Sequence, residues 1–250
     1  MCLLNFAKNK NLSHSLLVST NDIYLVIAAG GRGTRMGGDT PKQFRDWGGM
    51  CLMEATTRAF LTPNMPNITR VALAVPRNRV EQVKSWSLGL PTQVIAGGST
   101  RQESVHLALK SLPNIPNAIV LIHDAARPFP PSNPIAKAIE ALTTWDGAIL
   151  VEQSTDTLKR VDKIGQILCT EPRDNIFRAQ TPQVARLKLW QKAFDWAQTT
   201  GFQGTDDASL LEALGKRIKI ILSPTSNLKL TTQDDWIRAR LEHSNKHGVW

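Results

Sequence analysis

Residues 23–43 have the sequence IYLVIAAGGRGTRMGGDTPKQ, an apolar run that breaks at Gly30 into a loop with five glycines and two arginines. A run rich in Ile, Leu and Val is typical of a strand buried on both faces of a parallel sheet. The sequence therefore predicts a central strand followed by a long basic loop.

The composition of this loop is suited to holding phosphate. Glycines let the backbone approach a ligand closely and turn amide N–H groups toward it, and cations balance the charge of a polyphosphate. The glycines concerned are Gly30, Gly31 and Gly33, and the cations are Arg32, Arg35 and Lys42. The alternative is a glycine-rich turn with solvated charges.

Two common nucleotide-binding loops do not fit this stretch. A P-loop requires Gly-Lys followed by Ser or Thr, which occurs nowhere in the chain. The dinucleotide fingerprint places a glycine where Met36 stands, and here the loop continues to a proline instead of opening a helix. What remains, AAG followed by G-x-R-M and PKQ, resembles nucleotidyltransferases that transfer a nucleoside monophosphate to a phosphorylated small molecule.

The composition indicates a globular protein of one α/β domain. The chain has 250 residues, of which 42% are apolar and 20% charged, and no apolar run is long enough to suggest a membrane span. The net charge of +9 is spread along the chain without basic and aromatic clusters, so an anionic small substrate is expected and no nucleic acid partner. We therefore expect neither nucleic acid nor membrane as a partner.

Cysteine usage and the N-terminus suggest a compartment. Cys2, Cys51 and Cys169 are odd in number and far apart, which predicts neither a disulfide framework nor a metal site and favours a reducing, cytoplasmic location. Residues 1–21 lack acidic side chains, so organellar import is an alternative, although a disordered extension is the simpler interpretation.

Hydrophobic periodicity predicts the remaining elements of the fold. Further strands are expected at residues 70–75, 91–96, 119–122, 147–151 and 217–222. Helices are expected at residues 50–61, 78–86, from 99 or 100 onward, 135–142, 187–199, from 205 or 206 onward, and 233–242. Strands alternating with helices predict a Rossmann-like, mostly parallel sheet flanked by helices.

Two segments that follow predicted strands, one rich in glycine and one with a carboxylate and an arginine, can each be interpreted in two ways. In residues 97–105, GGSTRQESV, Gly98, Arg101 and Ser104 line a nucleotide pocket, or the segment merely caps a helix, with Glu103 completing a capping box. In residues 123–129, HDAARPF, Asp124 binds a ribose hydroxyl or a metal and Arg127 a phosphate, or the two form an ion pair that stiffens the turn.

Residues 153–170, QSTDTLKRVDKIGQILCT, alternate polar and apolar side chains around Gly165. This pattern predicts an antiparallel hairpin that projects from the body. The hairpin would expose the apolar side chains of Leu158, Val161, Ile164 and Leu168 unless another surface covered them. A second copy of the chain is the simplest such surface.

Taken together, the motifs resemble one family in order and spacing. AAGGRGTRM with PKQ, GGSTRQESV, HDAARP, DTLKR, PRDNIFRAQTPQ, TDDAS and NLKLT are similar to those of the 2-C-methyl-D-erythritol 4-phosphate cytidylyltransferases of the non-mevalonate isoprenoid pathway. The resemblance implies a cytidylyltransferase domain over residues 22–243 with an arm at about 153–172, after an extension at 1–21 and before a tail at 244–250. The chain is too short for the fused cyclase of some relatives, so a monofunctional enzyme is expected.

The same resemblance implies a role for particular residues. Those expected to bind the CTP nucleotide are Ala28, Ala29, Gly30, Gly33, Gly98, Ser104, Asp124 and Ala125. Arg35 and Lys42 are expected to stabilise the transition state, and Asp124 to hold Mg²⁺, directly or through water. The methylerythritol phosphate is expected to be held by Arg127, Thr157, Arg173 and Lys229, of which Arg173 and Lys229 also act in catalysis. Thr157 and Arg173 lie on the arm, so the resemblance implies a homodimer in which they reach the partner subunit's site.

The implied reaction is attack by the substrate phosphate on the α-phosphorus of CTP, with pyrophosphate leaving. A phosphate monoester is mostly a dianion at neutral pH, so no general base is needed. Two alternatives remain: a cytidylyltransferase acting on ribitol 5-phosphate, and a catalytically silent nucleotide-binding protein.

Overall fold

The structure is a computed structural model that describes residues 22–29 and 40–247. Its main feature is a seven-stranded sheet with the strand order β3-β2-β1-β4-β8-β5-β9. The strands are β1 (Ile23–Ala28), β2 (Ile68–Val75), β3 (Thr92–Ala96), β4 (Ile119–Asp124), β5 (Gly147–Gln153), β8 (Phe177–Arg186) and β9 (Ile218–Leu222). Parallel pairing joins β3, β2, β1 and β4 on one side, and β5 and β9 on the other. The predicted mostly parallel α/β sheet is confirmed.

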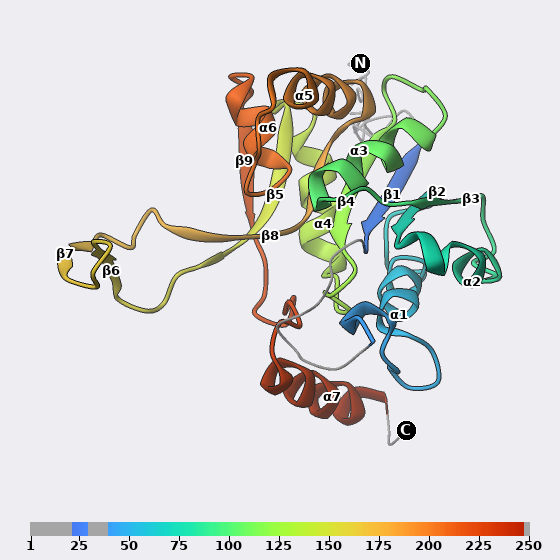
Figure 1. The fold of residues 1–250 in the computed structure, drawn as a ribbon, viewed down its shortest axis with the longest axis horizontal. Helices are drawn as coiled ribbons and strands as arrows, with labels where there is room; N and C mark the ends of the chain where they lie inside the picture. The colour runs from blue at the N-terminus through green and yellow to red at the C-terminus, as the bar shows by residue number, and fades with distance from the viewer. Residues whose placement is uncertain (1–21, 30–39, 248–250) are drawn as a thin grey trace, which may run out of the picture.

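Helices cover both faces of this sheet, as Figure 1 shows. The helices on the sheet are α1 (Leu52–Ala59), α2 (Val80–Lys84), α3 (Arg101–Ser111), α4 (Ser132–Ala141), α5 (Leu187–Thr200) and α6 (Ala208–Ala213). The 3-10 helices η2 (Lys42–Phe44) and η3 (Arg77–Arg79) lie in the connections, and α7 (Gln233–His247) lies apart from the sheet. Successive side chains of a strand point to opposite faces. In β1, Leu25 and Ile27 accordingly join the core on one face, while Tyr24 and Val26 join the core under α3 and α5.

The strand β8 was missed by the sequence analysis, which predicted no strand between residues 171 and 186. It runs antiparallel to both of its neighbours, β4 and β5. Its buried side chains include Gln180, Thr181 and Gln183, each of which makes hydrogen bonds inside the protein. A strand that buries hydrogen-bonded polar groups lacks the apolar run by which periodicity detects a buried strand.

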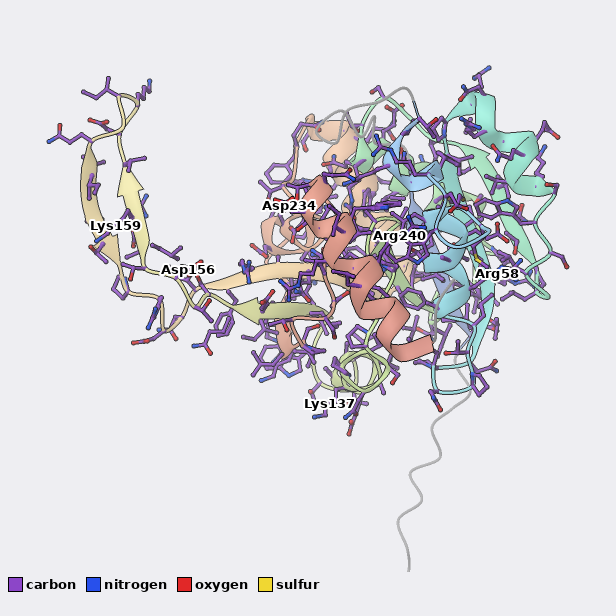
Figure 2. All side chains as sticks on the ribbon, turned by 90° about the horizontal axis from the view of Figure 1, so that it is seen from below. Arg58, Lys137, Asp156, Lys159, Asp234 and Arg240 are labelled. Atoms are coloured by element: carbon purple, nitrogen blue, oxygen red, sulfur yellow. The ribbon has the colours of Figure 1, made fainter. Side chains whose placement is uncertain are left out.

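The predicted hairpin is present and projects from the body as an arm, which Figures 1 and 2 show from two directions. It consists of β6 (Leu158–Val161) and β7 (Ile167–Glu171), paired antiparallel. Gly165 turns the chain between them with a φ of +89°, a conformation that favours glycine. The exposed apolar side chains of the arm are Val161, Ile164, Ile167 and Leu168.

Helix α7 closes the fold beside the segment that follows the first loop. Trp236 of α7 packs edge-on against Trp47 with ring centroids 5.1 Å apart, in a small cluster that also contains Leu230. The chain just before α7 is thereby held near η2. Among the described helices, none is long and apolar enough to cross a membrane.

Candidate functional site

The candidate site lies where the order of the parallel strands reverses. From β1 the chain proceeds outward to β2 and β3, and then returns to β4 on the other side of β1. Ala28 and Asp124, the last residues of β1 and β4, are directly paired. Ligands of open α/β sheets bind outside the carboxyl ends of the strands at such a point. Ala28, Ala29, Asp124 and Ala125 therefore lie where the sequence analysis expected a nucleotide.

Three cations surround the Asp124 carboxylate. Arg101 Nε lies 3.0 Å from Oδ1, Lys229 Nζ 2.8 Å from Oδ2, and Arg127 Nε 3.7 Å from Oδ2. Burial by itself would raise the pKa of Asp124, but Arg101, Lys229 and Arg127 together hold that pKa well below its ordinary range. The carboxylate therefore stays ionised at neutral pH and is a poor proton acceptor.

Arg101 joins Asp124 to a second buried carboxylate, that of Asp207. Its Nη1 and Nη2 donate to the two Asp207 oxygens at 2.8 and 2.7 Å, while its Nε donates to Asp124. The Asp207 side chain is only 1% exposed, against 34% for Arg101. Burial raises the pKa of Asp207, and the Arg101 guanidinium opposes that rise. The sequence analysis gave Arg101 as part of a nucleotide pocket in one of two interpretations, but it missed Asp207, because TDDAS was interpreted as a helix start and a family motif without a role for this residue.

Arg127 is buried in the turn that follows β4. Its Nη1 donates to the carbonyl of Asn227 at 2.7 Å, and its Nε forms the longer ion pair with Asp124. The ion pair that the sequence analysis gave as an alternative is thus present, and Arg127 ties the turn to the segment that carries Lys229. Its predicted contact with a substrate phosphate stays a prediction.

A chain of hydrogen bonds through His123 and Thr181 holds the backbone of Asp124 in place. His123 Nε2 donates to the Arg127 carbonyl, its Nδ1 accepts from the Thr181 hydroxyl, and that hydroxyl accepts from the Asp124 amide. This assignment of donors follows because a carbonyl can only accept. Burial lowers the pKa of His123 to about 4, so the ring is neutral and bonded at both nitrogens.

The first loop returns to the site through η2. Gln43 Nε2 donates to the Ala29 carbonyl at 2.6 Å, and Lys42 Nζ donates to the Leu230 carbonyl at 2.6 Å. Lys42 is therefore beside the residue that follows Lys229, so the structure brings these two predicted cations to one region. Gly30, Gly33 and Arg35 lie outside the described residues.

The glycine pair before α3 supports both interpretations of its segment. Thr100 accepts from the Glu103 amide at 3.0 Å and caps α3, as predicted. The buried Ser104 hydroxyl donates to the Thr100 carbonyl and accepts from the Gly98 amide. A Cβ at Gly97 would lie 2.8 Å from the Ser104 oxygen, so glycine is required there. Ser104 thus shapes the loop next to Arg101.

Thr157 and Arg173 are not near Asp124 of their own chain. Thr157 directly precedes β6 and Arg173 follows β7, where its Nη1 donates to the Thr155 carbonyl. Both residues are exposed on the arm, and Figure 2 shows the adjacent Asp156 outside the body. Their predicted role at the site of a partner copy stays a prediction.

The described residues do not contain a preformed metal site made of three or more His, Cys, Asp or Glu side chains. The single carboxylate of Asp124 nevertheless suits Mg²⁺, which is often bound by one or two carboxylates together with substrate phosphates. The Asp124 carboxylate therefore fits the expected ion when a polyphosphate is present.

Comparison with known proteins agrees with this geometry. Residues 23–242 match the family model described as 2-C-methyl-D-erythritol 4-phosphate cytidylyltransferase, IspD. The chain is 36% identical over 225 residues to the enzyme of that name from Acidobacterium capsulatum, covering 85% of this chain and 93% of the relative. It also resembles the crystal structure of the Francisella tularensis enzyme, with a TM-score of 0.75, 30% identity and coverage of 90% and 99%.

Proposed function

The chain belongs to the 2-C-methyl-D-erythritol 4-phosphate cytidylyltransferase family, and on that premise we propose how its residues carry out the reaction of that family. CMP is transferred from CTP to 2-C-methyl-D-erythritol 4-phosphate, giving 4-diphosphocytidyl-2-C-methyl-D-erythritol and pyrophosphate for isoprenoid biosynthesis. The observation that carries the proposal is the ionised Asp124 among three cations at the strand-order reversal, within the matched region.

Positioning and positive charge supply the catalysis in this proposal. The phosphate of the acceptor attacks as a dianion, so the site needs no base, and neither neutral His123 nor strongly ionised Asp124 offers one. The difficulty is to bring two polyanions together and to stabilise charge on the α-phosphoryl oxygens. Lys42 and Lys229, whose segments meet at Leu230, are assigned to that charge together with Arg35.

Asp124 is assigned to the nucleotide and to Mg²⁺. When bound at this site, Mg²⁺ would supply positive charge that stabilises the phosphates of the nucleotide. Asp124 would hold that ion by a carboxylate oxygen. The backbone of Ala28, Ala29 and Ala125 would lie beside the nucleotide.

The arm is assigned to a homodimer. Its exposed apolar side chains, including Ile164 at 87% exposure, would be covered by a second copy. The same association would bring Thr157 and Arg173 to the partner subunit's centre, where they hold the methylerythritol phosphate.

The decisive experiment measures pyrophosphate release from CTP and Mg²⁺ with methylerythritol 4-phosphate or ribitol 5-phosphate as the acceptor. Release with the former alone is expected. Release with ribitol 5-phosphate alone would show that ribitol 5-phosphate is the acceptor substrate of this chain. CTP binding without release from either acceptor would identify a silent nucleotide-binding protein. EDTA in a parallel reaction tests the divalent ion.

A further inference from the structure

We propose that Asp207 is a positioning residue of this site, which holds Arg101 so that Arg101 can anchor one oxygen of Asp124. The inference rests on the proposed function, because it concerns how the carboxylate is presented to a nucleotide and its cation. Asp207 itself is too deeply buried to serve as a ligand, with 1% of its side chain exposed.

The geometry of Arg101 carries this proposal. A guanidinium held through both terminal nitrogens by one carboxylate has its orientation fixed, because the two parallel hydrogen bonds prevent rotation about either one. Arg101 makes this paired contact with Asp207 at 2.8 and 2.7 Å, and its Nε is then directed to Asp124 Oδ1 at 3.0 Å. Asp207 thus determines where the third N–H of Arg101 points.

The two oxygens of Asp124 are consequently unequal. Oδ1 is paired with Arg101, which Asp207 holds in place, whereas Oδ2 is paired with Lys229. Lys229 is 40% exposed, and Asp124 is the only partner of its ammonium group among the described residues. Lys229 can therefore leave Oδ2 for a substrate phosphate and expose that oxygen to a divalent cation, while Arg101 keeps the carboxylate in position.

A purely structural role for Asp207 can be distinguished from a positioning role. Another contact also joins the start of α3 to the loop before α6, the two segments that Arg101 and Asp207 connect. Gln102, the neighbour of Arg101, donates to the Phe202 carbonyl at 2.9 Å and accepts from the Gly204 amide at 2.9 Å. Gln102 therefore anchors the loop before α6 to the start of α3 without touching Asp124. It provides the matched control.

The test compares Asp207→Asn with wild type by titration calorimetry of CTP at several Mg²⁺ concentrations, without the acceptor. Loss of the charge releases Arg101 to turn its paired N–H groups toward Asp124, where it competes with the cation. We expect the Mg²⁺ concentration for half-maximal CTP binding to rise about 10-fold, the effect typical of residues that orient a metal ligand. Asp207→Glu, which restores the carboxylate, should recover part of the loss.

The control Gln102→Ala should lower the thermal midpoint and leave the Mg²⁺ dependence of CTP binding unchanged. Arg101→Lys retains the cation but cannot contact both carboxylates as Arg101 does, so it should shift the Mg²⁺ dependence as Asp207→Asn does, even if the latter fails to fold. An unchanged Mg²⁺ dependence in folded Asp207→Asn or in Arg101→Lys would overturn the inference. Absence of pyrophosphate release by wild type would instead count against the proposed function.

Discussion

The Lys229 ammonium lies 2.8 Å from the Asp124 carboxylate, and it approaches from the solvent side. Asp124 is nearly buried, with 10% of its side chain exposed, whereas Lys229 is 40% exposed. The lysine is thus the more accessible partner of this pair for an anionic substrate. It can neutralise Asp124 before binding and substrate phosphates afterwards.

Lys229→Ala should therefore remove catalysis and leave the fold intact. Loss of a preorganised cation from a phosphoryl-transfer site is expected to lower kcat by about 100-fold or more. Arg101 remains on Asp124, so the thermal midpoint should change little. Pyrophosphate release measures the loss of catalysis, and thermal melting measures whether the fold is intact.

Lys84→Ala is the control for this variant, because Lys84 Nζ also lies 2.8 Å from a carboxylate, that of Glu81 on the exposed face of α2. Its activity and midpoint should match those of wild type. A Lys229→Ala protein that melts without a cooperative transition would show that Lys229 is structural.

Asp124 should contribute stability that disappears in acid. Its pKa in the folded protein is far below the value of about 3.9 for an unfolded chain, so the unfolded state binds a proton first as the pH falls. Stabilisation by the ionised carboxylate is then complete above about pH 4 and decreases below it. The free energies of unfolding of wild type and Asp124→Asn, measured in urea, should differ by a constant amount from about pH 5 to about pH 7. This difference should shrink at about pH 3. A difference unaffected by pH would contradict the assigned ionisation.

His123 should make stability depend on pH in a higher range. In the folded protein its pKa is about 4, below the ordinary 6.5, so the unfolded state takes up a proton first as the pH falls below 6.5. Its contribution is therefore fully present above pH 6.5 and is lost between 6.5 and about 4. His123→Gln, whose amide can still donate to the Arg127 carbonyl, should have a shallower pH dependence of unfolding free energy in this range. Equal slopes would show that His123 accepts a proton inside the fold.

Much of the sheet could be predicted from the sequence, because its parallel strands are apolar on both faces. The strands predicted from Ile23 and over residues 119–122 illustrate this, and in the structure they are paired as far as Ala28 and Asp124. The strand β8 could not be predicted in this way. Its buried Gln180 and Gln183 are satisfied by Glu152 and Asp206, contacts between segments that local periodicity does not relate.

Charge partners were predictable only where they are close in sequence. Asp124 and Arg127 are three positions apart in the sequence, and their pair was foreseen as an alternative. Arg101 and Asp207 are 106 residues apart, so their contact depends on the packing of α6 against α5 and of α5 against α3. The helix was predicted to begin at residue 205 or 206, but it begins at Ala208. Asp206 accepts from the Ser209 amide, and the adjacent Asp207 turns inward to Arg101.

The exposed position of Arg173 on the arm leads to a test of where it acts. If Arg173 serves the partner subunit's site, then Lys229→Ala and Arg173→Ala proteins are each inactive for a different reason. A mixed dimer of the two has one centre with both residues altered and one with both intact. After the two inactive proteins are mixed and allowed to exchange subunits, about a quarter of wild-type pyrophosphate release should return.

Subunit exchange must itself be demonstrated for this test to be conclusive. Each protein would carry a different affinity tag, so that sequential purification isolates mixed dimers, which should have about half of the wild-type activity. Ile164→Asp with Leu168→Asp, placed on the exposed apolar side chains of the arm, should prevent both dimer formation and recovery. Isolated mixed dimers without activity would mean that Arg173 acts within its own chain, whereas an active Arg173→Ala protein before mixing would mean that Arg173 has no role in the reaction. The arrangement in Figure 1, in which the arm projects away from the body, makes recovery the expected outcome.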